Sequence, residues 1–360
     1  MTETMTIDQE KLDAFIGRFA TDFGAALHAT TVVVGDKLGL YRALAEGPTD
    51  AADLAARTGT DARLVEEWLK AQYVSGYCEH DEATGTYRLS PEQAAVLAVD
   101  GTPAFLVGAM TIAASTAKDE EQVRKAFTSG RGMGWHEHCH DLFSGTERLF
   151  KPGYLGNLVS AWIPALDGVE ARLRHGIRVA DLGCGHGAST ILLAQSFPAS
   201  TFVGFDYHLE SIEAAHLRAA EAGVADRVRF EVASADDFGP ADGGDGGGWD
   251  LVCIFDALHD VGDPGRTARH IADRLAGDGT LLLVEPMAGE TLDENRNPVG
   301  RVFYAASTLI CTPNGLAQGG PALGAQVPEA TWRTVLAEAG LPRFRRAAET
   351  PFNRVFEARK

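Results

Sequence analysis

The sequence predicts an α/β protein in which a doubly wound, seven-stranded sheet follows an N-terminal helical domain. Three observations predict this class. From Ile177 onward, short apolar segments alternate with helical segments. A glycine-rich loop follows the first apolar segment, as it does in nucleotide-binding βαβ units. The first hundred residues instead show three helical segments and a hairpin, which is the pattern of a winged helix.

The composition argues against a nucleic-acid-binding or membrane protein. The chain has 360 residues, of which 45% are hydrophobic, and its formal net charge is −18 at pH 7. Such a charge opposes binding to a phosphate backbone, and no apolar run reaches the ~20 residues of a membrane span. The first eight residues do not resemble a signal peptide, and the five cysteines show no CxxC spacing. We therefore expect reduced thiols and a cytoplasmic location.

Residues 1–98 are predicted to form the winged-helix domain. We expect a short helix that Asp36 caps, a second helix that ends at Gly59, and a third that begins near Asp61. A turn at Gly85 would join the two strands of the hairpin. Residues 99–176 are predicted to form a helical connector that also serves as a lid.

Residues 177–360 are predicted to form the sheet domain. The strand candidates are rich in Val, Ile, Leu and Phe, as expected for a parallel sheet that is covered on both faces. The Gly- and Asp-rich stretch Gly239–Gly248 is predicted to be a mobile surface loop. Five parallel strands are expected at Ile177–Asp181, Thr201–Asp206, Val228–Ala233, Trp249–Asp256 and Gly279–Glu285, with helices at Ala188–Phe197, Leu209–Gly223 and Pro264–Ala276, and a closing antiparallel pair at Pro342–Glu349 and Phe352–Arg359.

The loop after the first strand is predicted to bind a nucleoside. Its glycines at 183, 185 and 187 allow a sharp turn and close approach of a ligand. Asp206 ends the second strand, 25 residues after Asp181, where an acid can accept both ribose hydroxyls. The loop reads GxGxG rather than GxGxxG and contains no Arg or Lys for phosphates, which argues against a dinucleotide.

With these residues the chain resembles the class I S-adenosylmethionine-dependent methyltransferases, whose sheet is Rossmann-like. Asp181-x-Gly183-x-Gly185-x-Gly187 matches their first motif, and Asp206 matches their ribose-binding acid. The resemblance implies S-adenosylmethionine as the cofactor. Ser234 stands where the family often has aspartate, so backbone groups or Asp236 are the alternatives for adenine. The resemblance places further cofactor contacts at Cys184, Tyr207, Ser234, Ala235, Phe255 and Asp256.

His259 is the predicted general base. It follows the fourth strand, at the sheet edge where such folds carry out chemistry, and histidine can remove a proton near neutral pH. The alternative is a loop histidine that caps the next helix. Leu258-His259-Asp260 resembles the Leu-His-Asp of plant-type and bacterial small-molecule O-methyltransferases, in which this histidine is the base. Glu285 matches the glutamate that orients it there. The same resemblance implies a homodimer formed through the winged-helix domain.

The segment around His136, His138 and His140 leaves three interpretations open. It could be a polar lid, or it could supply Trp135 and His138 as contacts to a small-molecule substrate. It could also join His259 and Asp260 in an Fe(II) or Zn site, as in a metal-assisted C-methyltransferase. The prediction favours no metal.

Two further alternatives concern other parts of the chain. The segment Asn297–Asn314 could be a core or dimer helix, or a substrate-pocket wall in which Tyr304 contacts the acceptor. A cofactor-sensing DNA-binding regulator is disfavoured, because residues 1–98 carry 8 Lys/Arg against 16 Asp/Glu. The sequence therefore predicts an O-methyltransferase that acts on a small molecule.

Overall fold

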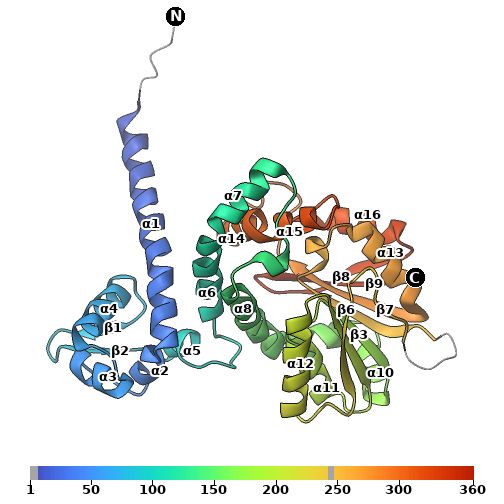
Figure 1. Cartoon of the computed structure of the whole chain (residues 1–360), viewed down its shortest axis with the longest axis horizontal. Coiled ribbons are helices and arrows are strands. Elements are labelled where there is room, and N and C mark those ends of the chain that lie inside the picture. Colours follow the sequence, from blue (N-terminus) through green and yellow to red (C-terminus); the bar gives the residue numbers. More distant parts are fainter. Residues whose placement is uncertain (1–6, 242–246) are drawn as a thin grey trace, which may run out of the picture. The chain divides into compact units, whose positions relative to one another are not determined.

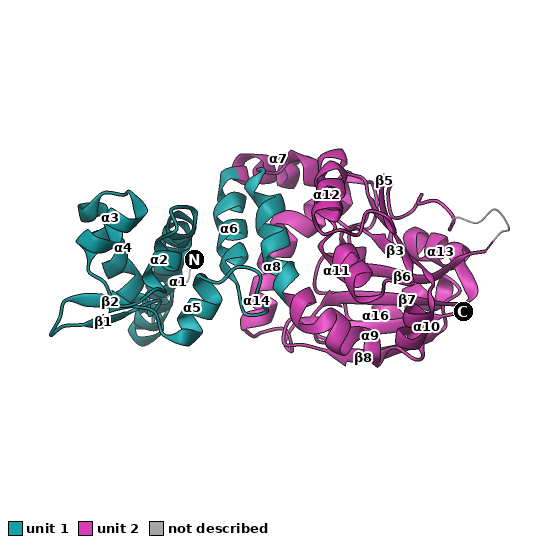
Figure 2. Ribbon diagram, turned by 90° about the horizontal axis from the view of Figure 1, so that it is seen from below, with its two compact units in different colours: residues 1–118, 140–152 teal, residues 119–139, 153–360 magenta. Residues whose placement is uncertain are grey.

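The computed structural model describes residues 7–241 and 247–360. The chain forms two compact units, which Figure 2 distinguishes by colour: unit 1 contains residues 1–118 and 140–152, and unit 2 contains residues 119–139 and 153–360. The segment predicted as a connector is thus divided between the units. Residues 242–246 of the predicted surface loop lie outside the described residues. In the described residues no helix is both long and apolar enough to cross a membrane.

Unit 1 contains the predicted three helices and hairpin of a winged helix. The side chain of Asp50 accepts a hydrogen bond from the backbone N–H of Asp53 and so caps one helix, which ends at Gly59 in the left-handed conformation. Asp61 caps the next helix in the same way. The elements of the unit are α1 (Gln9–Lys37), α2 (Leu40–Leu44), α3 (Ala51–Thr58), α4 (Ala62–Val74), β1 (Glu79–Asp81), β2 (Thr86–Arg88), α5 (Pro91–Leu97), α6 (Val107–Thr116) and the first part of α8 (Asp141–Asn157).

The predicted helix start at Asp36 is wrong. Asp36 lies in the last turn of α1, and its carboxylate accepts hydrogen bonds of 2.6 and 3.0 Å from the guanidinium of Arg148. The helix α1 ends at Lys37. Gly39 then adopts a φ of +74°, a conformation that favours glycine, and α2 begins at the next residue. The 29-residue α1 is the long helix of unit 1 in Figure 1.

Unit 2 contains a mixed seven-stranded sheet with the order β5-β4-β3-β6-β7-β9-β8. The first five strands in this order are parallel, and β9 runs antiparallel to both of its neighbours. The chain builds outward from β3 to β5 and then returns to β6, so the carboxyl ends of β3 and β6 flank the switch point where such sheets bind ligands. The strands confirm the predicted positions: β3 (Arg178–Leu182), β4 (Thr201–Asp206), β5 (Val228–Val232), β6 (Trp249–Phe255), β7 (Leu275–Pro286), β8 (Arg343–Glu349) and β9 (Asn353–Arg359).

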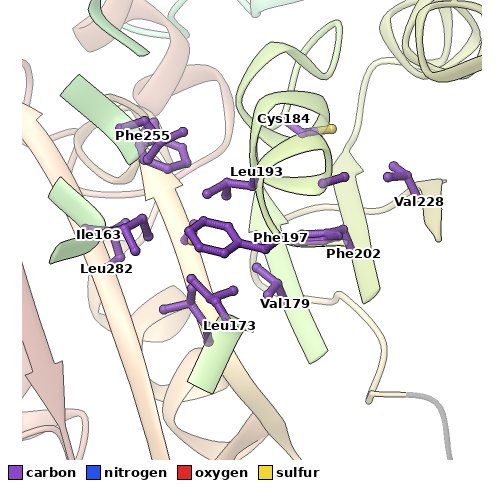
Figure 3. Close-up of a cluster of buried hydrophobic side chains, with 14 of the residues drawn as sticks. Ile163, Leu173, Val179, Cys184, Leu193, Phe197, Phe202, Val228, Phe255 and Leu282 are labelled. Atoms are coloured by element: carbon purple, nitrogen blue, oxygen red, sulfur yellow. The ribbon is translucent and has the colours of Figure 1, made fainter. Parts of the chain in front are cut away.

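Helices cover both faces of the sheet, because the strand side chains alternate between two apolar clusters. Leu251 and Cys253 belong to one cluster, and Val252 and Ile254 belong to the other. Figure 3 shows the first cluster, in which Phe197 lies among the strand residues. Helices on the first face are α9 (Ile163–Ala165), α10 (Val169–His175), α11 (Ala188–Ser196) and α12 (Leu209–Glu221), and those on the second are α13 (Pro264–Arg274) and α16 (Glu329–Glu338).

The remaining elements of the chain are short. The segment Asn297–Asn314 forms a bent helical run in which a π-helical turn separates two α-helices. The pieces are η1 (Ala117–Asp119), α7 (Glu120–Ser129), η2 (Trp135–Glu137), η3 (Leu158–Trp162), η4 (Leu258–Asp260), α14 (Pro298–Ala306), η5 (Ser307–Cys311) and α15 (Thr312–Ala317).

Candidate active site

The glycine loop between β3 and α11 depends on its glycines for two different reasons. Gly183, Gly185 and Gly187 all have positive φ, of 67°, 52° and 80°. A Cβ on Gly187 would lie 2.6 Å from the ring of Phe230, so this glycine lets α11 pack closely. A Cβ on Gly185 would meet nothing within 4 Å, so this part of the loop leaves room for a ligand to approach.

Asp181 connects the end of β3 to the first turn of α11. Its Oδ2 accepts hydrogen bonds of 2.6 Å from the hydroxyls of Ser189 and Thr190. Its Oδ1 is buried and has no hydrogen-bond partner. Burial raises the pKa of Asp181 to about 6, although the two hydroxyls favour the carboxylate. The free lone pairs of Oδ1 can therefore accept from a polar ligand group such as an ammonium.

Asp206 is bonded directly to the glycine loop. Its Oδ2 accepts from the backbone N–H of Gly185 at 2.9 Å, and its Oδ1 accepts from that of His208 at 2.9 Å. Each carboxylate oxygen can accept a second hydrogen bond, so Asp206 retains capacity for two ribose hydroxyls. The backbone N–H groups of Gly183 and Cys184 donate to Phe205 O, which holds the loop against β4.

The residues predicted for adenine follow β5. Ser234 and Ala235 are partly buried, and the hydroxyl of Ser234 donates to Asp236 Oδ1 at 2.6 Å. Asp236 also pairs with Arg266 of α13, so this carboxylate is already engaged. Tyr207 directly follows Asp206 and is 43% exposed.

His259 forms a buried pair with Glu285. His259 Nδ1 lies 2.7 Å from Glu285 Oε2, and the two side chains are 3% and 1% exposed. Burial disfavours the charged imidazole, but the carboxylates of Glu285 and Asp260 outweigh it and hold the pKa of His259 well above its usual value. Glu285 engages Nδ1, and Nε2 lies 3.2 Å from Asp260 Oδ1, so a ligand that exchanges a proton with the ring has to do so at Nε2. The side chain of Asp263, not His259, caps the next helix.

The two parts of the site are in contact. A Cβ on Gly183 would lie 3.2 Å from the Cβ of Ala257, two residues before His259. The loop that carries Ala257 starts at Asp256, which has a φ of +49°. Asn353 of β9 holds this residue, since its side-chain amide donates to both carboxylate oxygens of Asp256 at 2.8 and 3.0 Å.

The segment with alternating histidines reaches this loop through Asn314. The backbone N–H of Trp135 donates to Asn314 Oδ1 at 3.0 Å, and Asn314 Nδ2 donates to the backbone oxygen of Asp260 at 3.1 Å. His138 is fully buried, and its Nδ1 lies 2.9 Å from Asp119 Oδ2. Its Nε2 is buried without a hydrogen-bond partner. Tyr304, on α14, is 38% exposed.

The structure places a cysteine, rather than one of the three alternating histidines, close to His259 and Asp260. In the described parts of the chain, the donor group compact enough for a metal ion consists of His259, Asp260 and Cys311, with all donor atoms within 4.8 Å of one another. His136, His138 and His140 are not part of this group. Sequence reasoning missed Cys311 because it is 51 residues away and no spacing motif includes it.

Tyr154 is a second residue that the sequence did not reveal. Its ring lies 5.3 Å from that of Phe255 at the end of β6. Burial, together with the carboxylates of Asp256 and Asp181, raises the pKa of Tyr154 well above its usual value. Tyr154 therefore lies next to the end of β6, close enough to Asp181 and Asp256 for their charges to act on it.

Comparisons with known proteins find similarity to methyltransferases. Among curated proteins, the chain is 33% identical over 143 residues to the 27-O-demethylrifamycin SV methyltransferase of Amycolatopsis mediterranei, a match that covers 38% of this chain and 51% of that protein. It is 28% identical over 311 residues to the 3-hydroxy-5-methyl-1-naphthoate 3-O-methyltransferase of Streptomyces sahachiroi, covering 81% of this chain and 83% of the other. The chain thus spans about half the length of the first relative.

A solved structure matches the whole chain, and two family models match separate parts of it. Human N-acetylserotonin methyltransferase, solved in complex with SAM, superposes with a TM-score of 0.67 at 19% identity, covering 100% of this chain and 99% of the other. Residues 25–99 match the family described as Rv2258c-like winged HTH domain, and residues 173–327 match the family described as methyltransferase domain. The chain therefore contains a winged helix-turn-helix domain followed by a methyltransferase domain, and its fold is that of a methyltransferase solved in complex with SAM.

Proposed function

We propose that the protein transfers a methyl group from S-adenosylmethionine to a hydroxyl group of a small molecule, with His259 as the general base. The observation that carries this proposal is the buried His259–Glu285 pair, which lies 2.7 Å apart at the ends of adjacent strands. The loop that bears His259 contacts the glycine loop at Gly183. Two relatives named as O-methyltransferases of aromatic compounds support the choice of a hydroxyl acceptor.

The residues of the glycine loop fit the proposed cofactor. Asp206 would hold the ribose hydroxyls, Gly185 leaves room for the nucleoside, and Asp181 Oδ1 offers a buried acceptor for the ammonium group of the methionine part. Phe255 and Tyr154 would supply apolar ring surface next to the cofactor. When bound, S-adenosylmethionine supplies a methyl group that its positively charged sulfur already activates.

His259 would do the acid–base work of the reaction. Its Nε2 would accept the proton of the acceptor hydroxyl as the oxygen attacks the methyl group. Glu285 would keep Nδ1 protonated and would stabilise the resulting imidazolium, because a carboxylate at hydrogen-bond distance favours the charged form. The hydrogen bond to Glu285 would fix the orientation of the imidazole, and burial of the pair would keep water away from it.

The acceptor is proposed to be a small aromatic or polyketide-like molecule. Trp135 and His138 are candidates for contacting it, since hydrogen bonds through Asn314 connect their segment to the His259 loop. Tyr304 is a further candidate on α14, where its side chain is 38% exposed. The relatives act on a naphthoate, a phenazine and a rifamycin, as their names state.

We further propose that the chain forms a homodimer through α1. The first half of this helix carries an apolar stripe at helical spacing, and its side chains are more than half exposed. A stripe of this size on one helix is typical of an interface, and a second copy of the same helix would complement it. The stripe consists of Phe15 (62% exposed), Ile16 (54%), Phe19 (64%), Phe23 (58%) and Leu27 (59%).

Product analysis tests the proposed reaction. The purified protein is incubated with S-adenosylmethionine and a panel of hydroxylated aromatic acids, phenazines and naphthoates, with and without a chelator. An O-methylated product formed equally well with the chelator supports the proposal. A C-methylated product that the chelator abolishes would favour the metal-assisted alternative, and failure to bind S-adenosylhomocysteine would overturn the assignment altogether.

A further inference from the structure

We propose that His259, Asp260 and Cys311 form a binding site for one thiophilic divalent cation, with Zn²⁺ as the best match. One donor atom from each of the three residues lies within 4.8 Å of the other two. His259 Nε2 and Asp260 Oδ1 are the atoms of the first two residues that face each other, and Cys311 offers Sγ. They come from two elements of unit 2, since η4 carries the first two residues and η5 carries the third. Neither Asp260 Oδ1 nor Cys311 takes part in the proposed methyl transfer.

The distances suit a tetrahedral ion. His259 Nε2 and Asp260 Oδ1 lie 3.2 Å apart. Two ligands at about 2.0–2.2 Å from a tetrahedral Zn²⁺ are separated by about 3.3 Å, so this pair can bind without moving. The sulfur ligand requires a separation of about 3.6 Å from the nitrogen, which a rotation of the Cys311 side chain can supply.

A buried, unused acceptor also points to a ligand at this place. Asp260 Oδ1 is buried and, despite its short distance to the imidazole, has no hydrogen bond that satisfies it. Buried polar atoms are normally satisfied, so each exception calls for an explanation. A cation between Asp260 Oδ1 and His259 Nε2 would satisfy both atoms at once.

The surroundings of the site are those of a metal-binding histidine. Metal-bound imidazoles usually donate from their second nitrogen to a carboxylate, which fixes the ring and its tautomer. Glu285 does this for His259 at 2.7 Å. Asn314 holds the backbone of Asp260 through a 3.1 Å hydrogen bond, so the second ligand is fixed as well.

The charges and donor types favour a soft, doubly charged ion. The carboxylates of Asp256, Asp260 and Glu285 all act on His259 in a buried environment, and a dication would offset part of their mutual repulsion. One sulfur and one imidazole nitrogen disfavour Mg²⁺ and Ca²⁺, which take oxygen ligands. Thiolate, imidazole and carboxylate together suit Zn²⁺ or its probe Co²⁺.

The consequence for the enzyme is inhibition. His259 Nε2 cannot accept a proton from the acceptor while it is bound to a cation, so the cation and a reacting acceptor exclude each other. This consequence depends on the proposed function, whereas cation binding itself does not. The cation would therefore inhibit methyl transfer without weakening binding of the cofactor.

Cobalt spectroscopy of the full-length protein tests the site directly. Co²⁺ bound by a thiolate gives a sulfur-to-metal charge-transfer band, and Zn²⁺ should displace it at one equivalent per chain. Cys311→Ser should abolish the band and weaken Zn²⁺ binding at least tenfold. Cys139→Ser is the matched control, because Cys139 is a free cysteine outside the donor group, and this variant should retain the band.

A second readout covers the possibility that Cys311→Ser unfolds. Zn²⁺ should raise the Tm of the wild-type protein, because a ligand that binds only the folded state stabilises it, and Asp260→Asn should reduce this rise. A wild-type protein with neither the band nor the rise in Tm would overturn the proposal, as would a band that survives in a folded Cys311→Ser protein. If methyl transfer fails but the band is present, the proposed function falls and the cation site stands.

Discussion

Nδ1 of His259 lies 2.7 Å from Oε2 of Glu285, with both side chains almost completely buried. The pairing of two neighbouring strands brings these residues together. His259 follows β6, Glu285 lies near the end of β7, and Phe255 is in register with Val284 in the parallel pairing of these strands. The pair is therefore held by the backbone of two central strands rather than by the loop alone, and its effect on proton transfer can be tested.

Replacing His259 by alanine should stop catalysis but not cofactor binding. General-base catalysis contributes about 10²–10⁴-fold, so turnover should fall at least ~100-fold, while the Kd for S-adenosylhomocysteine changes little. Turnover is measured with the acceptor that the product assay identifies, and the Kd by calorimetry. His175→Ala, an exposed histidine of α10, is the control. Unchanged turnover in the His259 variant would remove this residue as the base.

Glu285→Gln should shift the pH profile of the reaction to lower pH. In the wild type the carboxylates raise the pKa of His259 well above its usual value, and the base must be neutral to act, so kcat/KM should increase with pH through that raised pKa. The glutamine amide replaces one carboxylate, which lowers the pKa of His259. The low-pH side of the kcat/KM profile should therefore shift to lower pH. Superimposable profiles would show that Glu285 does not control the proton on His259.

Asp206→Asn should weaken binding of the cofactor. Hydrogen bonds to a charged group contribute about 1.5–3 kcal/mol, which corresponds to roughly a 10- to 150-fold increase in Kd for S-adenosylhomocysteine. Calorimetry measures this directly. Asp226→Asn is the control because that aspartate, before β5, is 73% exposed. An unchanged Kd in the Asp206 variant would contradict the ribose-binding role.

Gly187→Ala should destabilise the fold more than Gly223→Ala. Both glycines have positive φ, of 80° and 69°, which costs about 1–2 kcal/mol for an alanine. Only at position 187 would the new Cβ also meet a ring, that of Phe230 at 2.6 Å. The free energy of unfolding in urea should therefore fall further in the Gly187 variant. Equal losses would mean that Phe230 moves away freely.

Phe19→Glu combined with Phe23→Glu should convert the proposed dimer into a monomer. The two rings stack 6.5 Å apart on the exposed face of α1, and charges there would have to be buried in the interface. Sedimentation analysis gives the mass in solution. Leu217→Glu, a 68% exposed leucine of α12, is the control. A wild-type monomer would contradict the proposal at once.

The sheet and the site at its carboxyl edge could be predicted because local sequence determines them. Central strands buried on both faces give uninterrupted apolar runs, and β4 begins and ends at the predicted residues. The long α1 was missed, and the apolar residues of its first half are exposed rather than part of a core. The proximity of Cys311 to His259 could not be predicted, because the two residues lie on separate elements far apart in the sequence. The π-helical turn of η5 also changes which face of the helix Cys311 occupies.

The hydrogen bonds from Asn353 to Asp256 span 97 residues, and this separation has a consequence for biosynthesis. A nascent chain that already contains the glycine loop, β6 and His259 still lacks the strand that anchors the turn after β6. Under the proposed function, the turn after β6 would be anchored only once β9 has emerged from the ribosome and inserted between β7 and β8. Truncated translation products would be inactive even where their nucleoside-binding half had already folded.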